Sequence, residues 1–351
     1  MREDLGNPKP MVQAPRRIDW FLIGMLAAVA LAWLAPELGA RGGPLHPELT
    51  SKLGVAVIFL LHGLTLSLAS LRDGMLLVRL HLVVQLTTFL AFPLLGLLLH
   101  ATLESSIGEH LAAGVFYLCA LPSTVSSSVA LTAAARGNVA AALFNATLSS
   151  LLGVVLTPLW VGWVLGSSGH TLPLAGVVID LLYWLILPLC LGQLLRLVAG
   201  ASASAWTTRH KGQLGHMDRV VILLLVYTTF CESVKSGVWR ESGAWVVVLT
   251  LGLSALLLSF GLAVATAACR WLDFSPSDRI AAIFCGSKKS LALGVPMAGL
   301  LFSHHPALSL LLLPILVYHS LQLFVVGLLA TRLRQAGEHA QAPDAPQAPR
   351  G

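Results

Sequence analysis

The sequence predicts an all-α polytopic membrane protein with ten transmembrane helices, because it has too few charged residues to cover a water-soluble surface. Of its 351 residues, 56% are hydrophobic and only 11% are charged, and the mean hydropathy is +0.81. Soluble domains carry about 25% charged residues. The composition therefore excludes a large water-soluble enzyme and a disordered chain.

Ten stretches of mostly apolar residues are long enough to cross a bilayer, which takes about 20 residues of helix. The first begins at Ile18 and has no small-residue cleavage site after it, so we expect a retained helix and not a signal peptide. The stretches centre near Met25, Phe59, Phe89, Pro122, Leu151, Trp184, Leu225, Leu256, Lys288 and Tyr318.

The basic residues predict the orientation. With the N-terminus inside, 16 of the 22 Lys and Arg residues fall in inner segments and 4 in outer ones, and the other two lie within a span. Basic residues are enriched in cytoplasmic loops. We therefore expect both termini in the cytoplasm, and a bacterial inner membrane. Because topology accounts for the net charge of +6, no nucleic-acid partner is predicted.

The spacing of the spans indicates an internal duplication. Moving the first five centres by about 163 residues places them near the last five. Because five is odd, the second copy enters the membrane from the opposite side, which makes an inverted repeat. Evenly spaced helices give a regular offset without duplication as well. The predicted divisions are a tail at 1–17, repeats at 18–165 and 172–334, and a disordered tail at 335–351.

The fourth and ninth spans are predicted to be broken at membrane depth. Proline removes a backbone donor and disfavours helix in the residue before it, and Ser and Thr can pair with the carbonyls that are freed. Interruptions at corresponding positions of two repeats indicate a transport site. The predicted crossover residues are Pro122, Ser123, Thr124, Ser126, Ser127 and Ser128 in span four, and Gly286, Ser287, Lys288, Lys289 and Ser290 in span nine.

Lys288 and Lys289 are the charges that the sequence places within a span. A lysine at a helix centre costs roughly 2.5–3.5 kcal/mol on insertion scales. One interpretation is a cation at the crossover; since neighbours point about 100° apart, one lysine would face the core and the other a cavity or the interface. The alternative is that both reach a membrane surface. No histidine spacing predicts a metal site.

For each of the other intramembrane polar residues, two interpretations remain. Gln85 suits a helix–helix contact or a ligand contact equally. Asn145, Thr147 and Ser149 in span five are placed to meet the serine run of span four or to pack closely. Asp180 and Glu232 lie near outer ends of spans, where a structural or interfacial role competes with a place in the site.

Several motifs together resemble the bile acid:sodium symporter family (solute carrier family 10), in the branch of member 7 and the bacterial SBF-like transporters. The resemblance covers about residues 18 to 333. The motifs are GLTL (63–66), HLVVQL (81–86) followed by Phe92-Pro93, ARGN (135–138), LTP (156–158), YTTFCE (227–232) and FCGSKKSLALGVPM (284–297).

The resemblance implies a panel of spans 1, 2, 6 and 7 facing a core of spans 3–5 and 8–10, with spans 4 and 9 crossing near the substrate and ion sites. It places sodium-binding positions on Ser126 to Ser128, on Thr147 and Ser149, and on Gln85. In span nine this chain departs from sodium-coupled members: Phe284 stands near the acidic position, and Lys288 and Lys289 at the polar ones. A fixed ammonium there would replace sodium electrostatically, and would repel it.

We therefore expect a secondary transporter that moves a small organic anion by alternating access, with sodium, protons or no ion as coupling partner. A cation/proton antiporter-like exchanger that uses an intramembrane lysine is the first alternative, and a non-transporting membrane regulator the second. No paired His/Glu metal motif or GxSxG elbow suggests an enzyme. Apart from Na+ as a candidate coupling ion, no cofactor is expected.

Overall fold

The computed structural model describes residues 20–65, 76–167, 182–235, 245–302 and 307–341, with single positions 179, 237 and 243. All elements in these ranges are helical. They are α1 (Trp20–Leu34), α2 (Pro36–Gly39), α3 (Pro47–Thr65), α5 (Val78–Leu86), the π-helix η1 (Thr87–Ala91), α6 (Phe92–Ile107), α7 (Glu109–Ala120), α8 (Ser126–Ala134), α9 (Val139–Ser167), the π-helix η2 (Leu182–Ile186), α11 (Leu187–Arg209), α12 (Lys211–Lys235), α14 (Trp245–Trp271), α15 (Pro276–Gly286), α16 (Leu291–Leu301) and α17 (Leu308–Gln341).

Eight helical segments of the described chain are long and apolar enough to cross a membrane. The remaining two predicted spans coincide with α1 and with the pair α7 and α8, which a break at 121–125 separates. Large apolar side chains such as Leu26, Trp163 and Leu197 are more than half exposed, as expected for surfaces that face lipid. The protein is therefore a multi-pass integral membrane protein.

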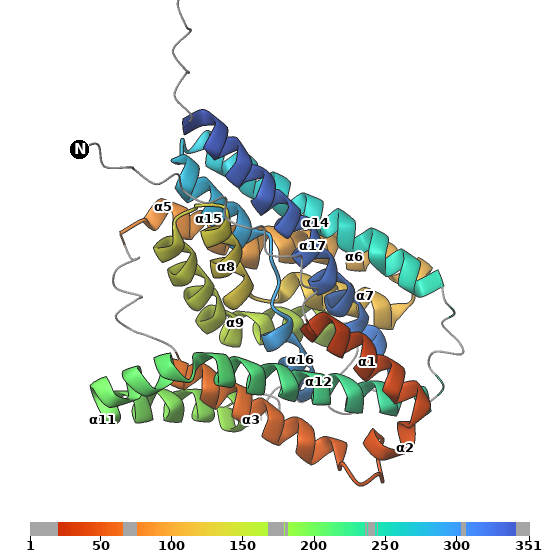
Figure 1. Ribbon diagram of the computed structural model, residues 1–351. Coiled ribbons are helices and arrows are strands. Elements are labelled where there is room, and N and C mark those ends of the chain that lie inside the picture. Colours follow the sequence, from red (N-terminus) through yellow and green to blue (C-terminus); the bar gives the residue numbers. More distant parts are fainter. Residues whose placement is uncertain are drawn as a thin grey trace, which may run out of the picture.

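The helices form two groups (Figure 1). In one, which we call the panel, α3 packs along α11 and α12 packs along α1, α2 and α3. The other, the core body, contains α5 to α9 and α14 to α17. The panel touches the core body mainly through α16 and α17. This arrangement agrees with the panel and core that the family resemblance implied.

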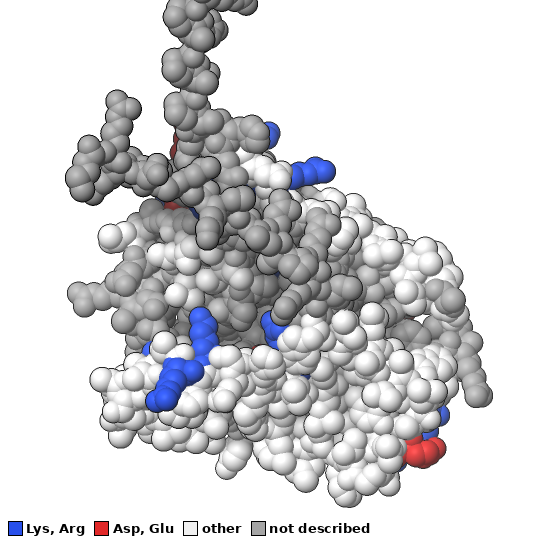
Figure 2. All heavy atoms as spheres, viewed as in Figure 1, with Lys and Arg blue, Asp and Glu red and all other residues white. Residues whose placement is uncertain are grey.

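Charged side chains are sparse on the surface. Figure 2 shows one face on which a few Lys and Arg side chains stand apart on a largely uncharged surface. The segment Pro276–Leu301 contains the twin lysines, yet 89% of its apolar 18-residue stretch is buried inside the protein. The corresponding share for Leu182–Arg209 is 11%. The most polar span thus lies inside the protein, and the apolar spans surround it.

Each of the two π-helices ends just before a proline, Pro93 after η1 and Pro188 after η2. Proline has no N–H for the carbonyl four residues earlier, which for Pro93 is that of Phe89. The indole Nε1 of Trp160 on α9 donates to this carbonyl instead, at 3.0 Å. The irregular turn therefore leaves carbonyls that other helices can use.

The ends of the chain differ in part from the sequence prediction. The helix α17 continues to Gln341, so residues 335–341 are helical and the prediction of a tail from 335 was wrong there. Ala, Glu and Gln in this stretch are good helix formers. The predicted tail at 1–17, the start of the second repeat at 172 and Asp180 lie outside the described residues.

Candidate functional site

Proline ends α7 in the middle of the core body. Leu121, the residue before Pro122, has an extended backbone with φ −70° and ψ 151°, as a residue before proline prefers. Residues 121–125 then run without helix until α8 begins at Ser126. A Cβ on Gly153 of α9 would lie 2.6 Å from the Pro122 ring, so only glycine lets α9 pack against this break.

The second break separates α15 from α16 over residues 287–290. Its end is a helix cap, because Ser290 has an extended backbone and its hydroxyl accepts a hydrogen bond from Leu293 N at 3.3 Å. Serine is a preferred capping residue. Both spans predicted to be interrupted are therefore interrupted, at 121–125 and at 287–290, while Ser126 to Ser128 and Gly286 lie in the helices that flank these breaks.

The two breaks contact each other directly. Ser290 N donates to Pro122 O at 2.8 Å. In return, Ser123 Oγ donates to Cys285 O at the end of α15, at 2.5 Å. Each break therefore pairs with backbone groups that the other one exposes.

Four successive carbonyls where α7 ends, from Cys119 to Pro122, are paired with groups from other segments. The last carbonyls of a helix have no partner within it, and each unpaired one in hydrocarbon costs several kcal/mol. Lys289 Nζ bonds to Cys119 O and Leu121 O, Thr157 Oγ1 bonds to Ala120 O at 2.8 Å, and Ser290 N takes Pro122 O. The break therefore depends on side chains from α9 and from the second break.

Lys289 is fully buried and fully paired. Its ammonium donates to Thr88 O at 3.0 Å, Cys119 O at 2.7 Å and Leu121 O at 2.8 Å. The ring of Phe92 lies 4.2 Å away, close enough for a cation–π contact. An ammonium has three protons to donate, so this one has a carbonyl for each.

Gln322 of α17 clamps the backbone of the same residue. Its Oε1 accepts from Lys289 N at 2.8 Å, and its Nε2 donates to Lys289 O at 2.9 Å. Tyr318, one turn earlier on α17, donates its hydroxyl proton to Ser287 O at 2.6 Å. The helix α17 thus holds the non-helical backbone of the second break.

Lys288 differs from its neighbour. It is fully buried as well, but within the described chain its Nζ has no hydrogen-bond partner. The described ion pairs include neither lysine. The alternative in which both lysines reach a membrane surface was wrong, because the surrounding helices cover both side chains completely. The break directs the ammonium of Lys289 toward three carbonyls and leaves the Nζ of Lys288 without an acceptor in the described chain.

Most of the predicted crossover residues lie together at the two breaks. Thr124 Oγ1 shares hydrogen bonds of 2.9 Å with Ser127 Oγ and Ser128 Oγ, and Ser128 Oγ is 3.5 Å from Phe284 O. Ser287 Oγ donates back to Ile283 O of α15. Gly286 packs against Thr87 of η1. The side chain of Ser126 lies outside the described residues.

The lower-ranked candidates divide between site and scaffold. Ser149 Oγ accepts from Ser123 N at 2.9 Å, so it belongs to the crossover. Gln85 Nε2 donates to both Asn145 O and Asn145 Oδ1, at 3.2 and 3.3 Å, which joins α5 to α9. Thr147 is buried on α9.

Glu232 lies on the panel helix α12, away from the crossover. Its carboxylate accepts from Arg41 N at 2.8 Å and lies 3.7 Å from Arg41 Nε. It anchors the turn after α2, so the structure does not bring it to the site.

Sequence reasoning missed Gln322, Tyr318 and Thr88, which contact the second break. Gln322 had a readable signal, since it is a lone amide in an apolar span. Thr88 contributes only its backbone carbonyl, which no residue type reveals. Pro93 was an indirect indication that the Thr88 carbonyl is available, because a proline leaves carbonyls of the preceding turn without their usual donor.

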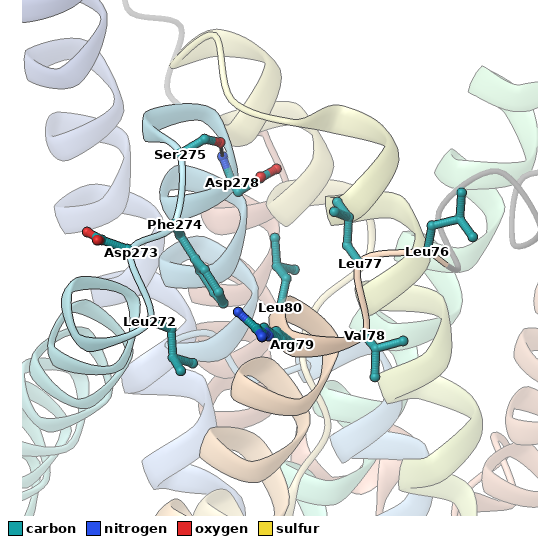
Figure 3. Close-up of a pocket in the computed structure, with 10 residues that line it drawn as sticks. All are labelled: Leu76, Leu77, Val78, Arg79, Leu80, Leu272, Asp273, Phe274, Ser275 and Asp278. Carbon is teal, nitrogen blue, oxygen red and sulfur yellow. Dashed lines mark hydrogen bonds between the residues drawn. The ribbon is translucent and has the colours of Figure 1, made fainter.

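A pocket of about 450 Å³ lies at the end of the core body where α14 turns into α15 (Figure 3). Figure 3 shows Arg79 reaching toward Leu272 and Phe274, while Asp273 points away. None of its lining residues belongs to the crossover: they are Leu76, Leu77, Val78, Arg79, Leu80, Leu272, Asp273, Phe274, Ser275 and Asp278. The twin lysines lie apart from this pocket and have no exposed surface.

Comparison with known proteins identifies the family. Residues 19–335, which contain every break and contact described above, match the SBF-like CPA transporter family. The chain belongs to this family of transporters. An uncharacterised Pseudomonas aeruginosa protein is 41% identical to this SBF-like protein, over 92% of the present chain and 95% of its own.

Two animal relatives carry a functional name. The rat protein named sodium/bile acid cotransporter 7 is 35% identical, over 91% of this chain and 93% of its own. The protein of the same name from Xenopus tropicalis is 34% identical, over 91% and 92%. The similarity therefore extends over nearly the whole length of both proteins.

Proposed function

We propose that this SBF-like protein is a secondary transporter that moves a small organic anion by alternating access around the two breaks. One observation carries the proposal: Lys288 holds a buried ammonium that no carbonyl or carboxylate of the described chain accepts. An unpaired buried charge costs several kcal/mol. A ligand with a carboxylate, sulfonate or phosphate would offset that cost.

Further unpaired groups support a ligand at this place. Gln85 Oε1 and Thr88 Oγ1 are also buried without hydrogen-bond partners in the described chain. They lie on α5 and η1; α15 packs against α5, and its last residue, Gly286, packs against Thr87 of η1. Such groups are rare in folded proteins, and each asks for an explanation such as a ligand or water. A hydroxyl on the substrate would suit Gln85.

Reciprocal pairing supports two inverted five-helix repeats. Ser123 of the first break bonds to Cys285 O at the end of α15, and Lys289 of the second bonds to Cys119 O at the end of α7. The two bonds involve corresponding positions of the two halves, because Cys119 and Cys285, and likewise Ser123 and Lys289, are 166 positions apart. A duplicated unit related by a two-fold axis produces such exchanges, whereas evenly spaced helices alone do not.

Access to the site requires a movement. Ser123, Ser287, Lys288 and Lys289 have no exposed surface, and the panel touches the core body mainly through α16 and α17. These contacts are few compared with those inside each group, so rocking of the core body against the panel is the movement that breaks least packing. Inverted-repeat transporters move in this way.

The test compares anion binding by the wild type and by Lys288→Gln. Purified protein is warmed with a panel of carboxylates, sulfonates and phosphates, including taurocholate, in sodium and in potassium buffers. We expect at least one anion to raise the wild-type Tm. Because a hydrogen bond to a charged group contributes about 1.5–3 kcal/mol, K288Q should bind it at least about tenfold more weakly.

Uptake of that anion into proteoliposomes then separates the functions. Transport driven by a sodium gradient, by a pH gradient or by the anion gradient alone identifies the coupling. A cation/proton exchanger remains a second candidate, because a lysine without acceptors is free to release its proton; it predicts pH-dependent cation exchange with no anion requirement. Equal anion binding by K288Q and wild type would refute the proposed role of Lys288.

A further inference from the structure

The cage around Lys289 consists of backbone carbonyls that two prolines set free. In η1, Phe92 N donates to Thr87 O, five residues back, and not to Thr88 O. The next donor that could reach Thr88 O belongs to Pro93, which has none. The carbonyl of Thr88 is therefore left for a partner from outside its helix, and Lys289 Nζ takes it.

Pro122 frees the other two carbonyls of the cage. In an unbroken helix Cys119 O would accept from Ser123 N, but that N–H donates instead to Ser149 Oγ of α9. The break also takes Leu121 O out of any helical ladder. Both carbonyls sit at the C-terminal end of α7, where the helix dipole is negative.

The geometry around Lys289 Nζ suits a small cation in general and not only an ammonium group. Three carbonyl oxygens at 2.7–3.0 Å, with the face of Phe92 at 4.2 Å, surround the nitrogen. Every one of these groups presents partial negative charge, and none is a carboxylate. Rings of carbonyls replace the hydration shell of K+ in channel filters in the same manner.

We propose that Lys289 is a resident cation: its ammonium permanently fills a carbonyl cation site that would otherwise hold an exchangeable monovalent ion. The two adjacent lysines then have different roles. Lys289 holds Thr88, Cys119 and Leu121 together, so it positions η1, α7 and the second break. Lys288 has no such cage. The inference concerns the architecture of the crossover and does not depend on which solute is moved.

The experiment empties the cage and offers small cations instead. Lys289→Ala removes the side chain and leaves the carbonyls without donors. The Tm of K289A and of wild type is measured in detergent with sodium, potassium, ammonium or choline chloride at equal ionic strength. We expect K289A to have a lower Tm in choline and to gain about 2 °C or more in a small cation. Wild type reports any sodium effect that arises elsewhere.

Lys288→Ala is the matched control, because it deletes the same side chain one residue away, where no carbonyls surround the nitrogen. Its Tm should show no gain in small cations beyond that of wild type. Lys289→Met keeps the stem in the cage and removes only the charge, so it should be less stable than wild type in every salt.

Three results would overturn the proposal. One is a K289A protein whose Tm is the same in choline as in all three small cations. Another is a K289M protein as stable as wild type. The third is that no salt recovers folded K289A or K289M. A failure of anion binding by K288Q or wild type would leave these readouts unaffected, so the two proposals are tested separately.

Discussion

At the scale of single residues, the site is an exchange of hydrogen bonds between two broken spans. Ser123, Lys289 and Ser290 each pair with a carbonyl of the opposite break. Such bonds contribute modestly when they are made, but a buried carbonyl that loses its partner costs about 1–3 kcal/mol. Small side chains at the breaks therefore matter more for stability than their size suggests.

The variant Ser123→Ala tests whether the hydrogen bonds exchanged between the two breaks stabilise the protein. The change leaves Cys285 O without the hydroxyl that donates to it, so we expect a loss of about 1–3 kcal/mol in stability, measured as a lower Tm. Ser150→Ala is the control, since Ser150 Oγ bonds only to a carbonyl of its own helix and its loss should be within about 0.5 kcal/mol. Equal effects of both changes would contradict the exchange.

At the scale of elements, two glycines set how closely α3 and α11 cross in the panel. A Cβ on Gly63 would lie 2.2 Å from Leu189 O, and one on Gly192 would lie 2.4 Å from Leu60 O. Small residues allow this approach between membrane helices. Gln193 and Arg196 of α11 then donate to Gly63 O and Leu64 O at the end of α3, so the crossing also caps a helix.

Gly63→Ala should therefore be costly although it adds one methyl group. The methyl meets backbone, which cannot rotate away, and we expect a loss of about 1–3 kcal/mol in a thermal or denaturant unfolding measurement. Gly252→Ala on α14 adds the same methyl where nothing lies within 4 Å. It should leave the Tm unchanged or raise it slightly. A tolerated G63A would show that the two helices can separate freely.

Much of this element pattern could be predicted from the sequence, and the reasons are physical. Pro122 and the serine run, and the Gly-Ser-Lys-Lys run, are incompatible with continuous apolar helix, so the two breaks were predictable. The hydrogen-bond partners of the residues at the breaks were not predictable. Which backbone carbonyl Lys289 reaches depends on Thr88, whose side-chain identity is irrelevant to that bond. For Glu232 the sequence left an interfacial role and a place in the site both open, and its pairing with Arg41 on the panel favours the first.

At the scale of the whole molecule, the charges on the loops predict how the protein sits in the membrane. Asn138 caps α9 and also bonds to Asp278 and to Ser277 O at the start of α15. The turn after α8 and the turn before α15 therefore lie at one end of the core body. Arg136, Arg270 and Arg279 lie in or beside these turns, which favours that end as the cytoplasmic one.

Cysteine labelling tests this orientation. In a Cys190→Ala background, Ser105→Cys should react with an impermeant maleimide in intact cells. Ser105 lies in the last turn of α6, at the end of span three that the predicted orientation places outside. Thr208→Cys, at the end of α11, should react only after permeabilisation. Both positions are exposed, whereas the other four cysteines are buried. The reverse pattern would refute cytoplasmic termini.

The contacts of α17 have a consequence for biogenesis. Tyr318 and Gln322 hold the backbone of the second break, and they belong to α17, a helix that the ribosome makes after that break. Until α17 has been made, the segment with both lysines lacks these hydrogen bonds, and its insertion into lipid is costly. A chain that stops before α17 therefore lacks the hydrogen bonds that Tyr318 and Gln322 make to Ser287 and Lys289, and its second break stays unsupported at membrane depth.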